Sequence, residues 1–268
     1  MRRNLPAWLL LLFAAAALGP FGCSSPPQPG EVPGEEGDFH RAERLFRQGR
    51  YLQAVEALDA YRNEHPGSDR IDDAIFLLGM AHQKQGENLL ARDEFDRLLR
   101  DYPQSSHREE AQYERALAWL ADARGPALDP EPTEEALSAF RAYLRLYPEG
   151  AHRADAEQFE AKCLDRLARK AYLNGKTYLK AKEGEAARIY FEKSLSIRSE
   201  STCAGDAMLG LARAHRLRGD AAAEQAAWQQ LLDYATVERM AREPHLKKLR
   251  REAEQALARE EAAAPGSR

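Results

Sequence analysis

The sequence predicts an all-α fold built from repeated helix hairpins, and three observations lead to this prediction. First, 47 of the 268 residues are Ala, whereas Val, Ile and Thr together number only 11. Because β-sheets need β-branched and aromatic side chains on their faces, we expect no sheet of any size. Second, the strong helix formers Ala, Leu, Glu, Arg and Gln dominate the chain. Third, one pattern of small and bulky residues recurs along it.

The charge balance argues against one class of partner. The formal net charge is −4, and charged residues make up 31% of the chain. Domains that bind nucleic acids are usually basic, so we expect no nucleic-acid partner. A membrane-spanning helix needs about 20 consecutive apolar residues, and we expect none to remain in the mature protein.

Residues 1–22 have the features of a secretory signal peptide. Two Arg residues open the chain, and an apolar run of about 13 residues follows at 7–19, which is too short for a membrane span. The run leads into Cys23 and resembles the lipobox of bacterial lipoproteins, although Pro20 and Phe21 replace the usual Leu and small residue. The resemblance implies that Cys23 carries acyl chains. The alternative is ordinary secretion with an incidental Cys.

Residues 23–37 are predicted to join that lipid anchor to the folded domain. The segment after Cys23 is rich in Pro, Gly and Ser and has no core-forming residues, as expected of a flexible spacer. Several acyl chains on one residue give stable anchoring. Ser24 follows Cys23 directly, and its resemblance to sorted lipoproteins of Gram-negative cells implies the periplasmic face of the outer membrane.

Residues 38–236 are predicted to form one repeat domain. A small residue is followed by an Ala, usually twelve residues later, and then after four residues by a bulky apolar residue. Small residues let two helices approach closely, Gly ends the first helix, and Pro stops the second. The five sets are Ala42-Ala54-Leu58, Gly79-Ala91-Phe95, Ala116-Ala136-Phe140, Gly175-Ala187-Phe191 and Ala212-Glu224-Trp228.

The repeats depart from a regular pattern in four places. The third carries an inserted loop at 124–132, and the fourth has a long first helix, predicted at 153–182, and a turn at Gly184. Ser199 replaces the expected Pro, and Glu224 replaces an Ala. Residues 237–268 are predicted to form a capping helix, to about residue 261, and a disordered tail, since terminal repeats need a polar outer face.

These residue types at these spacings resemble the tetratricopeptide repeat. That resemblance implies a right-handed superhelix of about five helix hairpins with a C-terminal capping helix. Together with the lipoprotein signal and the spacer, it extends to the BamD family of outer-membrane assembly lipoproteins. Supporting segments are residues 42–54, Tyr102-Pro-Gln-Ser105, Tyr147-Pro-Glu-Gly150 and the helix containing residues 163–169.

Membership of that family would imply a scaffold without catalysis or cofactor. Its expected partners are the β-barrel insertase of the outer membrane, other subunits of the assembly machinery and unfolded outer-membrane protein segments. Two alternatives share the repeat type, namely a Tol-associated envelope or cell-division coordinator and a pilus-assembly lipoprotein. Coordinators of the Tol type usually carry a coiled coil before the repeats, and no heptads precede them here, which favours the first function.

The candidate binding site is a ladder of aromatic residues three positions before the small residue of each repeat. In tetratricopeptide repeats this position usually faces the concave groove, where aromatic rings suit an extended peptide with apolar anchors. Five positions after the small residue, Arg47 and Lys84 would neutralise a terminal carboxylate. The alternative is that the rings pack between repeats. The ladder consists of Phe39, Phe76, Tyr113 and Tyr172, followed by Leu209.

Other chemistry is not predicted. The seven His residues are scattered, and the chain has no Gly-rich phosphate loop or nucleophile elbow, so we expect no metal site and no enzyme. Cys163 and Cys203 would meet an oxidising periplasm. They would either form a disulfide or be two small buried residues.

Overall fold

The computed structural model describes residues 34–123, 125 and 129–263, and this part of the chain forms twelve helices and no strand. The predicted all-α hairpin fold is confirmed. The signal peptide, Cys23 and most of the spacer lie outside the described residues, as does the tail after residue 263. The first ten helices are α1 (Glu35–Arg47), α2 (Tyr51–Glu64), α3 (Ile71–Lys84), α4 (Asn88–Asp101), α5 (Arg108–Asp122), α6 (Glu131–Leu146), α7 (Arg153–Lys180), α8 (Gly184–Ile197), α9 (Ala204–Arg218) and α10 (Ala221–Tyr234); α11 (Val237–Arg242) and α12 (Leu246–Ala263) follow.

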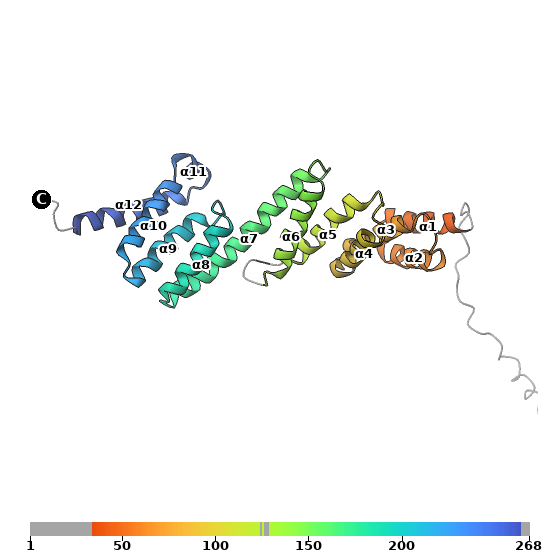
Figure 1. Ribbon diagram of the computed structural model, residues 1–268, viewed down its shortest axis with the longest axis horizontal. Coiled ribbons are helices and arrows are strands. Elements are labelled where there is room, and N and C mark those ends of the chain that lie inside the picture. Colours follow the sequence, from red (N-terminus) through yellow and green to blue (C-terminus); the bar gives the residue numbers. More distant parts are fainter. Residues whose placement is uncertain (1–33, 124, 126–128, 264–268) are drawn as a thin grey trace, which may run out of the picture.

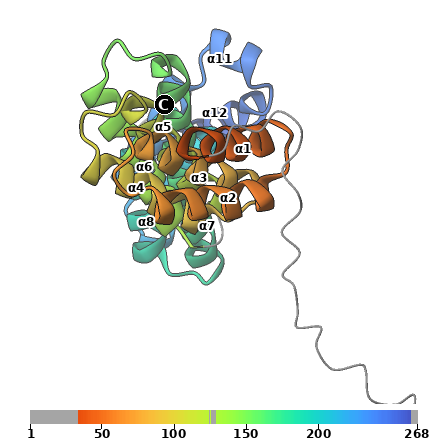
Figure 2. The same cartoon turned by 90° about the vertical axis from the view of Figure 1, so that its right-hand side faces the viewer.

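The hairpins form a single row. Figure 1 shows α1 and α2 at one end and α12 at the other, with the intervening hairpins in chain order. Figure 2, viewed from the end of the row, shows the hairpins overlapping one another, so the molecule is elongated in one direction only. Helices pack on their neighbours in sequence, and the first helices of adjacent hairpins also meet, as α1 does with α3 and α7 with α9. Such nearest-neighbour packing is characteristic of repeat proteins.

Two glycines of the repeat pattern mark close approaches within the second and fourth hairpins. A Cβ atom placed on Gly79 would lie only 2.6 Å from Cε1 of Phe95, and one on Gly175 would lie 2.8 Å from Cδ1 of Phe191. The bulky partners Phe95 and Phe191 are completely buried. Shape complementarity between a small residue and an aromatic ring therefore holds the two helices together, as the pattern predicts.

The turn of the fourth hairpin differs from the prediction that Gly184 lies in it. Lys182 adopts the left-handed conformation there, with a φ of 64°, and Gly184 is the first residue of α8. A Cβ atom on Gly184 would lie 3.1 Å from the carbonyl oxygen of Ala214 and 3.0 Å from Cβ of Leu217. The glycine is thus explained by close packing on α9 rather than by the turn.

Second helices end just before a proline in the first three hairpins. Glu64, Asp101 and Leu146 are their last residues, each two positions before a Pro, because the residue preceding Pro is disfavoured in a helix. The fourth hairpin lacks that Pro, and the long α7 supports its exit loop instead. Asp165 accepts hydrogen bonds from the backbone N–H (2.7 Å) and the hydroxyl (3.0 Å) of Thr202.

The irregular Glu224 of the last hairpin is buried and hydrogen-bonded through Oε1. It accepts a hydrogen bond from Nε1 of Trp228 at 3.1 Å and one from Nε of Arg216 at 2.7 Å. A buried carboxylate is tolerated when such partners satisfy it. The substitution for Ala therefore leaves the hairpin intact.

The C-terminal segment contains two helices, and the prediction of one continuous helix from 237 to about 261 is wrong. Pro244 lacks an N–H and disfavours helical backbone at Glu243, so the chain breaks between α11 and α12. α12 then packs against α9 and α10, burying Leu246 and Leu249 in the same apolar cluster as Trp228. The expected capping contact is present, but the segment reaches it through a bend.

Candidate functional site

The aromatic ladder lies on the first helices of the hairpins, α1, α3, α5 and α7. Phe39 and Tyr113 are only 1% and 6% exposed, and packing between repeats accounts for both. Burial, helped by the carboxylate of Asp155, raises the pKa of Tyr113 to about 12. Phe76 and Tyr172 are half-buried and keep part of their surface in contact with solvent.

Three ladder rings are covered by a side chain from the following loop. The covering residue stands directly before the first helix of the next hairpin, where the chain comes back across the ladder. The two imidazole rings stack almost parallel to the rings beneath them, at 3° and 6°. The Cζ atom of Arg70 lies 4.0 Å from the ring centre of Phe39, and centroid distances are 4.4 Å for His107 on Phe76 and 4.1 Å for His152 on Tyr113.

Carboxylates hold the covering side chains in place. Asp73 pairs with Nε2 of His107 at 2.8 Å and also accepts a hydrogen bond from Nε of Arg70 at 3.1 Å. Glu110 pairs with Nε2 of His152 at 2.6 Å. Asp73 and Glu110 each precede a ladder ring by three residues and so share its helix face. This arrangement was not predicted from the sequence, although a signal for it exists. Each covering residue lies four positions after the Pro of its loop.

The fourth repeat lacks this cover. Cys203 takes the position of the covering residue, and its short side chain is buried, with Sγ 3.4 Å from the Ser201 hydroxyl and 3.8 Å from the Ser194 hydroxyl. Beside Tyr172 there is a pocket of ≈ 370 Å³ between α7, α8 and α9. It is lined by Tyr172, Lys176, Leu179, Lys180, Phe191, Asp206, Leu209, Gly210 and Arg213.

The two basic residues of the predicted site lie apart from the rings. Arg47 is exposed at the end of α1, where its Nη2 is 2.6 Å from Oε1 of Glu43. It borders a hollow of ≈ 380 Å³ that is lined by His40, Glu43, Arg44, Arg47 and Gln48. Lys84 is exposed at the end of α3. Among the described residues, neither cation contacts a ladder ring. Their role as a carboxylate site remains a prediction.

Cys163 and Cys203 are both free thiols, so they are two small buried residues and not a disulfide. Cys163 is fully buried in the apolar cluster of the third hairpin, and burial raises the pKa of its thiol to about 11.

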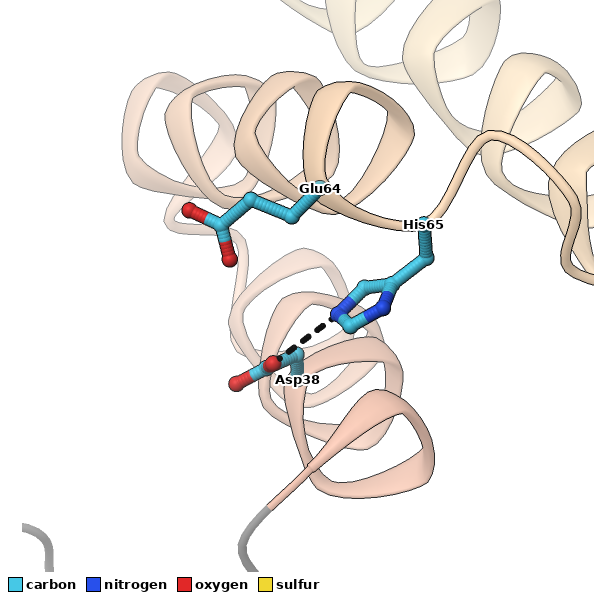
Figure 3. A group of neighbouring side chains, drawn as sticks. All are labelled: Asp38, Glu64 and His65. Atoms are coloured by element: carbon cyan, nitrogen blue, oxygen red, sulfur yellow. Dashed lines mark hydrogen bonds and ion pairs between the residues drawn. The ribbon is translucent and has the colours of Figure 1, made fainter.

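Asp38, Glu64 and His65 meet where α1 and the end of α2 lie together (Figure 3). Their possible ligand atoms lie within 4.8 Å of one another, a geometry that the sequence did not predict because Asp38 and His65 are far apart in the chain. Nε2 of His65 is 3.2 Å from Oδ2 of Asp38; these two residues are half-buried, whereas Glu64 is exposed. The hydrogen bond between His65 and Asp38 holds these two side chains together.

The fold defines a class of protein, a helix-hairpin repeat protein, and this one has a pocket between α7, α8 and α9. No helix among the described residues is both long and apolar enough to cross a membrane. The family described as YfiO, outer membrane lipoprotein, matches residues 35–231, and the chain belongs to this family.

Two curated relatives carry the same name, "Outer membrane protein assembly factor BamD". The Caulobacter vibrioides protein is 27% identical over 65% of this chain, and the match spans only 57% of that protein's length. The Vibrio cholerae protein is 26% identical over 62% of this chain and 73% of its own length.

Solved structures of low similarity include repeat proteins. A tetratricopeptide repeat protein from Parabacteroides merdae has a TM-score of 0.36 and 18% identity, covering 84% of this chain and 73% of its own. The tetratricopeptide protein TTC0263 from Thermus thermophilus has the same TM-score and identity, covering 84% of this chain and 100% of its own.

Proposed function

We propose that this protein is a non-catalytic assembly factor for outer-membrane proteins, a scaffold lipoprotein of the β-barrel assembly machinery. The observation that carries the proposal is the family match over residues 35–231, which covers all five hairpins almost to the end of α10. The names of both relatives agree with it. The partners would be the periplasmic domains of the insertase, other subunits of the machinery and unfolded outer-membrane protein segments.

The elongated stack supports such a role. Each hairpin packs on the next one, so the first helices present one continuous surface along the row. Along this surface Phe76 and Tyr172 retain exposed area, and a pocket opens beside Tyr172. Aromatic rings that are partly exposed contribute large contact areas at protein interfaces.

We further propose that Cys23 carries the lipid anchor and holds the protein on the periplasmic face of the outer membrane. Residues 24–34 stand between Cys23 and α1, which begins at Glu35. Eleven residues span at most on the order of 40 Å when fully extended. The first hairpin would therefore work close to the membrane surface.

Affinity purification from detergent-solubilised envelopes tests the function. A tagged chain expressed at its natural level should recover the β-barrel insertase together with other assembly subunits. Recovery of Tol components or of pilus proteins without the insertase would contradict the proposal.

The anchor is tested by Cys23→Ala, with Ser25→Ala as the matched control. The Cys23→Ala chain should lose incorporation of an alkyne-labelled palmitate analogue and leave the membrane fraction, whereas the control should keep both. A Cys23→Ala chain that stays labelled and bound to membranes would rule out this attachment site.

A further inference from the structure

We infer that the pocket between α7, α8 and α9 binds a peptide segment of a partner that carries a large apolar side chain next to a carboxylate. The inference rests on the proposed function only in taking the partner to be a protein. It places the ligand in the fourth and fifth hairpins rather than along the whole aromatic ladder. Apolar surface, unpaired positive charge and the missing cover over Tyr172 argue for this site.

The apolar part of the pocket is a preformed hollow. Leu179 and Leu209 line it together with the rings of Tyr172 and Phe191. Gly210 completes it: a Cβ atom at that position would run into the ring of Phe191, so the glycine lets α9 lie directly against that ring. The volume of ≈ 370 Å³ falls in the range of about 300–1,000 Å³ usual for ligand pockets. One large apolar side chain fits such a space.

The polar part of the pocket carries excess positive charge. Three cations, Lys176, Lys180 and Arg213, line it with a single carboxylate, that of Asp206. Nη2 of Arg213 is held by Glu252 at 2.5 Å. Among the described residues, no carboxylate pairs with Lys176 or Lys180. Two exposed ammonium groups are therefore free to meet a carboxylate at the rim.

The pocket exists where the repeat pattern is broken. In the first three hairpins, an Arg or His side chain from the following loop lies over the ladder ring. In the fourth hairpin, Cys203 occupies that loop position and its side chain is buried in the core instead. Among the described residues, Lys176 is the cation over Tyr172, with its Nζ 5.5 Å from the ring centre, and the ring of Phe191 lies beside it at 6.0 Å. A flexible Lys on the rim can move aside or pair with a ligand, whereas a stacked imidazole anchored by a carboxylate would block the site.

The required carboxylate has two possible sources, a chain terminus or an acidic side chain. Fluorescence anisotropy with three labelled peptides of otherwise identical sequence separates them. The first ends in Phe with a free carboxylate, the second is its C-terminal amide, and the third is the amide with Glu placed before Phe. The full-length protein in detergent micelles should bind the first or the third peptide, and the stronger of the two identifies the source.

Charge reversal at the rim then tests the location. Lys176→Glu combined with Lys180→Glu should weaken binding of the preferred peptide by about tenfold, the effect of roughly 1.4 kcal/mol. The matched control is Lys247→Glu with Lys248→Glu, the same charge change at two exposed positions of α12 outside the pocket. The control should stay within about twofold of the parent chain. Far-ultraviolet circular dichroism checks that both variants remain helical.

Three results would overturn the inference. These are no binding of either carboxylate peptide, equal binding of the simple amide, or equal losses in the pocket and control variants. Because the peptides are synthetic and the protein is purified, failure here leaves recovery of the insertase as an independent test. Recovery without peptide binding would refute the pocket alone, and peptide binding without recovery would refute the assembly role alone.

Discussion

His107 and His152 join neighbouring hairpins by lying flat on the rings of Phe76 and Tyr113. Each imidazole is also hydrogen-bonded to a carboxylate on the same helix as the ring it covers, which fixes its orientation. Aromatic pairs of this kind contribute about 0.5–1.5 kcal/mol beyond the area they bury. The three covered ladder rings thus stabilise three junctions between hairpins, independently of any ligand that Tyr172 binds in the fourth hairpin.

His107→Ala should lower the free energy of unfolding by about 1–2 kcal/mol, because it removes both the stack on Phe76 and the hydrogen bond to Asp73. Urea denaturation followed by circular dichroism measures the change. His245→Ala is the control, because that side chain is 46% exposed and approaches Asp206 only at 3.9 Å. Equal effects of the two substitutions would show that the stack contributes nothing.

The two thiols should be inert in the folded protein. Because burial raises the pKa of Cys163 to about 11, only about one molecule in a thousand would carry the thiolate at pH 8. A Cys23→Ala chain should react with Ellman's reagent only after guanidinium is added, and then at both sites. Rapid reaction of the folded chain, or a faster gel band without reductant, would contradict the buried free thiols.

In the second and fourth hairpins, a small residue on the first helix meets an aromatic ring on the second. Where Gly79 faces Phe95, α3 and α4 approach so closely that no room is left for a methyl group. Phe95 is completely buried and packed within the cluster of the first two hairpins. The ring therefore cannot move aside without disturbing its neighbours.

Gly79→Ala should destabilise the protein by about 1–3 kcal/mol, because overpacking at Phe95 outweighs the better helix propensity of Ala. Gly67→Ala serves as the control, since nothing lies within 4 Å of a Cβ atom there. In a double-mutant cycle, Phe95→Leu should relieve part of the loss caused by Gly79→Ala. Purely additive losses would show that the ring is not the cause.

At the scale of the whole molecule, each hairpin is stabilised by packing on the hairpins next to it in the row. α12 closes one end, where it shares an apolar cluster with α9 and α10. The first two hairpins and α5 share another cluster, far along the row from that end. Loss of one end should therefore be felt locally rather than throughout the chain.

Ending the chain after Arg242 removes α12 and should expose the apolar surface that Leu246 and Leu249 cover. Hydrogen exchange should then accelerate in α9 and α10 and stay unchanged in α1 to α4, where the contacts are intact. A chain that ends after residue 263 is the control and should match the full protein. Uniform acceleration along the row would contradict nearest-neighbour stability.

The sequence by itself determined the helices, the five hairpins and the small and bulky residues that join them. These features are local and periodic, so Ala54 with Leu58, or Gly79 with Phe95, can be recognised from spacing alone. The break at Pro244 carried a local signal as well, although the prediction of a single helix overlooked it.

Only the tertiary structure decided which ladder rings are covered. His107 lies over Phe76 and His152 over Tyr113 because the return of the chain brings together residues from neighbouring repeats. The same return places Cys203 in the core and opens the pocket beside Tyr172. A repeat pattern specifies the backbone of each hairpin. The exposure of a side chain also depends on which residues of the next hairpin and its loop cover it, and these are placed only when the two hairpins pack together.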